Sequence, residues 1–233
     1  FGGDAFMVRR NDVGINACDG TEENCPQWRY PSITMEEWRA IKALPSVGAA
    51  SPWLFGNASI RYMDTSFESV NLEAYGAEWL KTDGGDIYPG RNYTEKEATN
   101  AAPVAILNDT LAKKLFGQSD PIGKQVMIDG QQFSVIGIYQ TRAGFLKSMD
   151  GRGPETPKII TPAETARRRL NVWMRGMMVN VKPRAGARHD FRHTERAADL
   201  DHRTVRLLVI DSCATLVATL LETWIRSRPD SKS

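Results

Sequence analysis

Hydrophobic and polar positions in the middle of the chain follow a pattern that predicts a strand and then a short helix. The apolar run 103–107 contains β-branched residues and favours a buried strand. Asn108 or Asp109 can cap a helix over 110–116, which has apolar side chains on one face and lysines on the other. Gly117 follows, and a glycine just past the last turn ends a helix.

A hairpin is predicted directly after this helix. The apolar runs 126–128 and 133–139 flank the dipeptide Asp129-Gly130. Both of these residue types tolerate positive φ, which a tight hairpin turn requires. Two antiparallel strands are the expected result.

Similar patterns predict further elements on both sides. Before this stretch we expect a helix over 33–44 capped by Ser32 or Thr34, a strand over 47–55, a hairpin of 60–62 with 67–72, and a turn or short helix over 75–80. After it we expect a long connection over 142–162 with a strand at 158–161, and a strand over 177–181.

The connection between helix and hairpin, G-Q-S-D-P-I-G-K over 117–124, looks like a phosphate-binding loop but departs from its pattern. Five residues separate its glycines, one more than in the motif, and Gln125 stands where Ser or Thr would hold Mg²⁺. Pro121 also removes a backbone donor. We interpret the segment as a turn.

The central stretch resembles the periplasmic core domain of MacB-type ABC transporter permeases. The likeness is carried by the G-R-N-Y-T-E-K-E turn at 90–97, by P-V-A-I-L-N-D-T-L-A-K-K-L-F-G over 103–117, and by D-P-I-G-K-Q-V-M-I-D-G-Q-Q-F-S-V-I-G-I over 120–138. Upstream, residues 6–10 resemble the family's first strand, 33–44 its first helix, and 47–52 the strand that follows. The resemblance covers about residues 1–184.

The resemblance implies an α+β fold of two subdomains with mixed sheets. A membrane-proximal subdomain would be discontinuous, built from 1–56 and 158–186, and a distal one, 57–150, would be inserted into it. The domain would lie on the periplasmic side of the bacterial inner membrane, between the first and second membrane helices of a permease, so that Phe1 follows a membrane helix. The implied partners are those membrane helices, an ATP-binding domain, a second copy of the chain, and a periplasmic adaptor or lipoprotein.

Composition and charge narrow the function classes. The chain has 233 residues, 41% of them hydrophobic, and a formal net charge of +2. That charge is too small to favour nucleic acid as a partner, and Lys and Arg are scattered rather than gathered in one stripe. The sequence has no uncharged apolar run of about 18 residues or more, so we expect no membrane-spanning helix within it.

Cysteine spacing raises the possibility of a disulfide. Cys18 and Cys25 enclose a polar, turn-forming segment, and an oxidising compartment allows them to pair. Two free thiols in a surface loop, or half of a metal site, are the alternatives. Cys213 lies in an apolar segment and is expected to be a buried free thiol.

Candidate catalytic groups lead to no recognisable chemistry. The three histidines, His189, His193 and His202, all follow Arg184, and none accompanies a nucleophile motif. His189 and His193 have the i, i+4 spacing of a metal pair, but we interpret them as part of a solvated face. We therefore expect no catalytic residue, no metal and no cofactor.

Acidic and basic residues have structural interpretations too. We expect the carboxylates of turns and helix ends to accept hydrogen bonds from backbone amides, and the triplet 167–169 to form a solvated face. The carboxylates in question are Glu95, Glu97, Asp109 and Asp120.

The last segment, 187–233, departs from the family pattern. Lysine is absent between Lys182 and Lys232 while arginine becomes frequent, a change that suggests a reading-frame shift or an unrelated fusion. Residues 205–225 are expected to be helical at best. A closing helix that covers the membrane-proximal sheet is then missing.

Two functions remain open at the level of sequence. The first is a non-catalytic extracytoplasmic domain that couples cytoplasmic ATP hydrolysis to periplasmic movement, for export or for action on a partner. The second is a stand-alone periplasmic binding protein or enzyme without a recognisable motif.

Overall fold

A computed structural model describes residues 5–9, 33–83, 85–140, 156–170, 177–185 and 208–210. Its elements in chain order are β1 (Phe6–Arg9), α1 (Met35–Lys42), β2 (Val47–Tyr62), β3 (Thr65–Tyr75), α2 (Leu80–Asp83), β4 (Asp86–Gly90), α3 (Glu95–Thr99), β5 (Val104–Asn108), α4 (Asp109–Phe116), β6 (Gln125–Ile128), β7 (Gln131–Gln140), β8 (Lys158–Pro162), α6 (Ala163–Arg169), β9 (Met178–Pro183) and β10 (Leu208–Ile210).

The described strands form one mixed sheet in the order β10-β1-β9-β2-β3-β8-β5-β7-β4, with β6 paired to β2 and β7. β3 runs parallel to β8 and β5 runs parallel to β7, while the other pairs are antiparallel. The α+β class with a mixed sheet is therefore confirmed. The division into two subdomains stays a prediction.

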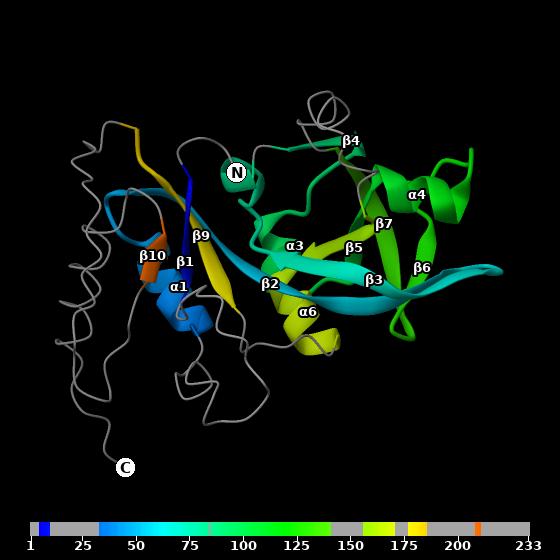
Figure 1. The fold of residues 1–233 in the computed structure, drawn as a ribbon, viewed down its shortest axis with the longest axis horizontal. Helices are drawn as coiled ribbons and strands as arrows, with labels where there is room; N and C mark the ends of the chain where they lie inside the picture. Colours follow the sequence, from blue (N-terminus) through cyan, green and yellow to red (C-terminus); the bar gives the residue numbers. More distant parts are fainter. Residues whose placement is uncertain are drawn as a thin grey trace, which may run out of the picture.

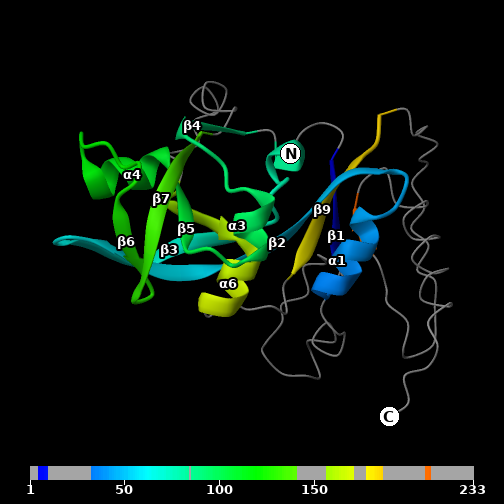
Figure 2. The same cartoon turned by 180° about the vertical axis from the view of Figure 1, so that it is seen from behind.

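Strand β2 connects the two ends of the molecule. It is 16 residues long, or about 50 Å at 3.3 Å per residue. At one end it pairs with β9, beside α1 and β1, and at the other it pairs with β6, near α4 (Figures 1 and 2). It crosses position 56, where we expected one subdomain to give way to the other.

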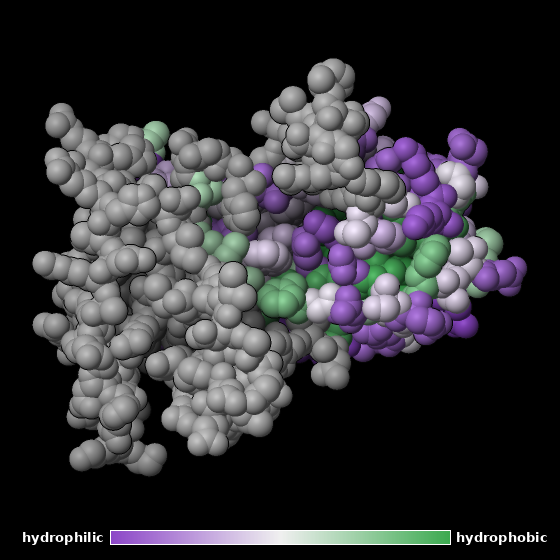
Figure 3. Space-filling view, viewed as in Figure 1, coloured by the Kyte–Doolittle hydropathy of each residue, from purple (hydrophilic) through white to green (hydrophobic). Residues whose placement is uncertain are grey.

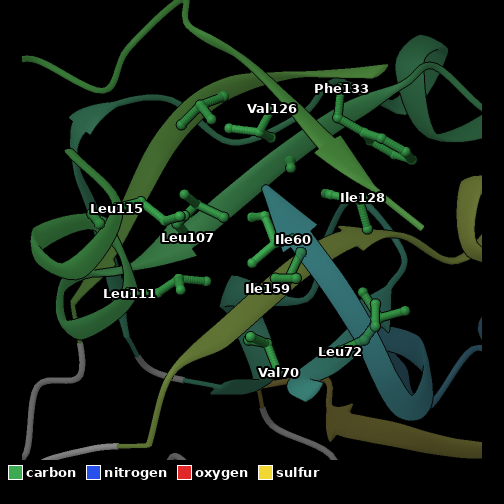
Figure 4. Packing of buried hydrophobic residues seen from close by; sticks show 14 of the residues in the cluster. Ile60, Val70, Leu72, Leu107, Leu111, Leu115, Val126, Ile128, Phe133 and Ile159 are labelled. Carbon is green, nitrogen blue, oxygen red and sulfur yellow. The ribbon is translucent and has the colours of Figure 1, made fainter. Parts of the chain in front are cut away.

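Three buried clusters hold these elements together. The α1 cluster comprises Val8, Ile33, Ile41, Val47, Ala50, Leu54, Ala74, Ala163, Ala166, Met177, Val179 and Val181. The α4 cluster is larger, and Figure 4 shows Leu111 and Leu115 of α4 directed toward Ile60, Leu107 and Ile159 of the sheet. The aromatic cluster contains Tyr75, Trp79, Tyr93 and Tyr139 with Val104, Ile106 and Ile160. β2 contributes side chains to the first two clusters.

Hydrophilic residues gather over the end of the molecule that carries α4 and the tip of the β2–β3 hairpin (Figure 3). Met63, at that tip, is 76% exposed and has a positive φ of 48°.

Local predictions in the central stretch are confirmed. Asn108 caps α4, accepting a hydrogen bond from the amide of Leu111 at 3.1 Å. Gly117 ends the helix with φ 60°. The β6–β7 hairpin turns at Asp129 and Gly130, which have φ values of 45° and 76°. Asp129 is also held by the strand beside it, because its carboxylate accepts the amide of Ser59 at 2.7 Å.

The first helix is shorter than the expected 33–44. α1 covers Met35–Lys42, and Thr34 caps it in a capping box with Glu37. The helix predicted over 205–225 is wrong at three positions, because Leu208–Ile210 form β10 and pair antiparallel with β1. Only these residues of 187–233 belong to the described part of the chain.

Candidate functional site: the groove beside α1

The phosphate-loop-like segment is a turn, as predicted. Its backbone amides already have acceptors within the chain: Ile122 donates to the Asp120 carboxylate at 3.0 Å, Gly123 to the carbonyl of Val135 at 2.8 Å, and Lys124 to that of Pro121 at 3.2 Å. A phosphate would have to break these bonds. The turn leads from α4 to β6.

The predicted capping role holds for two of the four acidic residues. Glu97 accepts the amide of Thr94 at 2.8 Å and Asp120 accepts that of Ile122. Asp109 instead pairs with Lys113 at 2.6 Å, and Glu95 lies 3.7 Å from Lys42. For Asp109 and Glu95 the sequence prediction was therefore wrong, because their carboxylates contact lysines and not backbone amides.

The histidines considered as metal ligands and the three cysteines, including Cys18 and Cys25, lie outside the described residues. Within the described ranges, no group of three or more His, Cys, Asp or Glu side chains is placed to hold a metal ion. No helix of the described part is long and apolar enough to cross a membrane.

A groove of about 400 Å³ lies where α1, α3 and α6 approach β2 and β3. The same helices can be followed in Figure 2. Its apolar lining includes Met35 and Trp38 from α1, Pro52 from β2 and Tyr75 from β3, and its charged lining comprises Arg39, Lys42, Glu95, Glu164 and Arg168. The groove therefore joins an aromatic surface to charges from three helices.

Close backbone packing shapes the groove beside Trp38. The indole N–H of Trp38 donates to the carbonyl of Ala50 at 3.0 Å, which fixes α1 against β2. The amide of Gly76 donates to Ser51 Oγ at 3.0 Å. A Cβ on Gly76 would lie 2.9 Å from Pro52 Cδ and 3.5 Å from Trp38 Cζ2, so only glycine allows this approach.

On the α3 side of the groove, a lysine lies between two carboxylates. Lys42 Nζ lies 3.1 Å from Glu78 and 3.7 Å from Glu95, and 5.6 Å from the centre of the Trp38 ring. A hydrogen bond from Lys81, aided by Lys42, lowers the pKa of the Glu78 carboxyl. These contacts tie α1 to the turn after β3 and to α3.

On the α6 side of the groove, three arginines share Glu164. Its carboxylate lies 2.8 Å from Arg167 and 3.2 Å from Arg168, both on α6, and 3.8 Å from Arg39 on α1. The Glu164 side chain is only 11% exposed. From the sequence we interpreted the basic triplet 167–169 as a solvated face. The signal that we missed is the spacing of Glu164, which precedes Arg167 by three residues and Arg168 by four and can therefore pair with both on one helix.

Next to the groove, the G-R-N-Y-T-E-K-E turn holds the aromatic cluster. Asn92 accepts the indole N–H of Trp79 at 3.0 Å, and the Tyr93 hydroxyl donates to the carbonyl of Tyr75 at 3.2 Å. Arg91 makes two hydrogen bonds to Glu97, of 2.8 and 2.9 Å, and lowers the pKa of that carboxyl to about 2. The polar groups of these side chains therefore bond to other residues of the chain and stabilise the fold.

The described residues thus form a packed fold with a groove beside α1. Membership of a family is established by comparing the sequence with models of protein families. The model of the MacB-like periplasmic core domain matches residues 3–189. The chain belongs to this family. The resemblance found in the sequence is therefore confirmed.

Curated relatives include longer export proteins. The chain is 30% identical over 148 residues to the pyoverdine export ATP-binding/permease protein PvdT of Pseudomonas syringae pv. syringae, covering 62% of the chain and 22% of that protein. It is 29% identical over 174 residues to the macrolide export ATP-binding/permease protein MacB of Nitrobacter winogradskyi, covering 71% and 25%. The chain thus spans about a quarter or less of these relatives.

Solved structures share the fold. The periplasmic region of MacB from Actinobacillus actinomycetemcomitans matches with a TM-score of 0.66 at 15% identity, covering 98% of this chain and 95% of that one. The extracellular domain of the noncanonic ABC-type transporter YknZ from Gram-positive bacteria matches with a TM-score of 0.58 at 18% identity, covering 78% and 84%. At these identities the likeness concerns the fold alone.

Proposed function

We propose that this MacB-like core domain is the non-catalytic, extracytoplasmic domain of an ABC export permease. It passes movement driven by cytoplasmic ATP hydrolysis to the periplasmic side. The observation that carries the proposal is the family match over residues 3–189. The relatives whose names state export and an ATP-binding part support it.

The arrangement of β2 supports a mechanical role. A single strand contributes to both the α1 cluster and the α4 cluster, so displacement of one end is passed along a hydrogen-bonded ladder to the other. Ion pairs from Arg39 and Lys42 on α1 reach α6, the turn after β3, and α3. Movement of α1 relative to the body of the sheet would therefore have to rearrange these ion pairs.

Several finer points belong to the same proposal. The membrane-proximal part would be 1–56 with 158–186, and the distal part 57–150. Membrane helices, an ATP-binding domain, a second copy, and an adaptor or lipoprotein would be its partners. Cys18 and Cys25 would form a disulfide in the oxidising periplasm. The segment 187–233 would be a frame-shifted or unrelated addition.

The test uses the complete permease that contains this domain. The gene should encode membrane helices on both sides of it, with an ATP-binding domain in the same chain or beside it. A short bis-maleimide bridge between Lys42→Cys and Glu95→Cys would tie α1 to α3. We expect export by proteoliposomes to fall at least tenfold while ATP hydrolysis continues, because α1 can no longer move relative to α3 and hydrolysis is no longer coupled to export.

The matched control is a bridge between Asp109→Cys and Lys113→Cys, which pair within α4 and whose linkage restricts no movement between elements. Export that survives the α1–α3 bridge, or falls equally with the control bridge, would contradict the proposed coupling. Substrate turnover by the isolated 233-residue chain would favour a periplasmic enzyme instead.

A further inference from the structure

We propose that the groove beside α1 binds an organic anion that has an apolar body and a single carboxylate. The body would lie against Met35, Trp38 and Pro52, and the carboxylate would bind Arg39 and Arg168. This site goes beyond the proposed coupling function and does not depend on it.

The charge balance on the α6 side of the groove favours an anion. Arg39, Arg167 and Arg168 share the single carboxylate of Glu164, which leaves two positive charges in excess. Each guanidinium has five N–H donors, whereas a carboxylate offers about four lone-pair sites. A second carboxylate can therefore be bound by donors that Glu164 does not use.

Exposure shows that two of these arginines can reach a ligand. The side chains of Arg39 and Arg168 are 60% and 53% exposed, and both line the groove. They come from α1 and α6, so they approach a ligand from two sides. Guanidinium groups bind carboxylates with paired hydrogen bonds, which fixes the orientation as well as the position of an anionic head.

The remaining lining suits an apolar body. Trp38, Met35, Pro52 and Tyr75 form the apolar part of the groove together with the small side chains of Ala43, Ala77, Ala98 and Ala163. The Trp38 ring is held by its hydrogen bond to Ala50, so the surface exists before a ligand arrives. A volume of about 400 Å³ lies within the range of small-molecule sites.

The α3 side of the groove limits the ligand to one anionic group. Lys42 is already paired with Glu78 and Glu95, and the two carboxylates outnumber it. A second anionic group placed there would be repelled. The groove therefore orients its ligand, with the carboxylate toward α6.

The experiment uses the 233-residue chain and 1-pyrenebutyrate, a fluorescent carboxylate, with the uncharged 1-pyrenebutanamide as its partner probe. Fluorescence anisotropy should show saturable binding of the carboxylate at least tenfold tighter than that of the amide. The double variant Arg39→Gln/Arg168→Gln should lose this margin. It leaves Arg167 to pair with Glu164, so no buried charge is left alone.

Arg61→Gln is the matched control, since Arg61 is an exposed arginine on β2 outside the groove. It should bind both probes as the unchanged chain does. Thermal unfolding reports whether each variant is folded. If the double variant is unfolded, the single variant Arg168→Gln is used in its place. Equal affinity for the two probes, an unchanged margin in the arginine variants, an equal loss in Arg61→Gln, or no saturable binding would each overturn the proposal.

Discussion

Asn108 on β5 holds the backbone of Lys158, fifty residues later, at the start of β8. Its side-chain oxygen accepts the Lys158 amide at 2.9 Å, and its side-chain nitrogen donates to the carbonyl of Thr156 at 2.9 Å. The same oxygen caps α4 through the amide of Leu111. One fully buried side chain therefore connects the start of α4 to the start of β8, although the two lie far apart in the sequence.

Replacing Asn108 should be among the most destabilising polar substitutions in the described part. Asn108→Ala removes a helix cap, worth about 1 kcal/mol, and leaves buried backbone groups without partners, at about 1 to 3 kcal/mol each. We expect the free energy of unfolding in urea to fall by about 3 kcal/mol or more. Asn71→Ala is the control, because the exposed Asn71 side chain also contacts Thr156, donating to the Thr156 hydroxyl at 3.3 Å. This substitution should lower the free energy of unfolding by about 0.5 kcal/mol or less. Similar losses in the two variants would contradict the bridging role.

The cap on α4 was predictable from sequence, and the bridge to Lys158 was not. Capping depends on residues three positions apart, so Asn108 before an amphipathic run is enough to indicate it. Pairing of β5 with β8 joins segments far apart in the chain, and no local pattern encodes their register. For the same reason the hairpin at Asp129-Gly130 was predicted correctly, while the sheet order and the full length of β2 were not.

The groove beside α1 was missed for a related reason. Its charged residues come from three helices, and only the contacts of Glu164 with Arg167 and Arg168 are local. α3 and α6 were not predicted as helices because each is short: 5 and 7 residues. The motif G-R-N-Y-T-E-K-E was identified, but its structural roles became clear only when Trp79, Tyr75 and Ile136 were placed beside it.

Gly90, the first residue of that motif, should not tolerate a side chain. It has φ 95°, and a Cβ there would lie 2.3 Å from the carbonyl oxygen of Ile136. Gly90→Ala therefore adds a collision with backbone to the strain of positive φ. We expect it to lower the free energy of unfolding by at least about 3 kcal/mol, or to prevent folding.

Gly130→Ala separates the two effects. Gly130 also has a positive φ, of 76°, but a Cβ there meets nothing within 4 Å. It should cost only about 1 to 2 kcal/mol from the backbone conformation. Equal thermal unfolding midpoints for the two variants would show that the contact with Ile136 is unimportant.

The Arg91–Glu97 pair should make stability depend on pH in the acid range. Arg91 holds the pKa of Glu97 at about 2, well below its ordinary 4.5. A carboxyl with a lowered folded pKa stabilises the protein above its unfolded pKa, and this contribution is lost as the pH falls through the folded value. We therefore expect the stability difference between the unchanged chain and Glu97→Gln to shrink between about pH 4.5 and pH 2 in chemical unfolding. Glu68→Gln, which also removes a carboxylate but at an exposed position on β3, is the control. A stability difference for Glu97→Gln that stays constant over this range would rule out the lowered pKa.

Gly76 tests the packing that shapes the groove. Gly76→Ala would place a methyl group 2.9 Å from Pro52 Cδ and close to Ser51 Oγ and Trp38, so we expect a loss of about 1 to 3 kcal/mol in unfolding free energy. Pro52→Ala removes the atom that the new methyl group meets. In a double-mutant cycle, the Gly76→Ala/Pro52→Ala chain should then lose less stability than the two single losses added together, by about 1 kcal/mol. Strict additivity would mean that Pro52 does not limit the approach of Gly76 to α1.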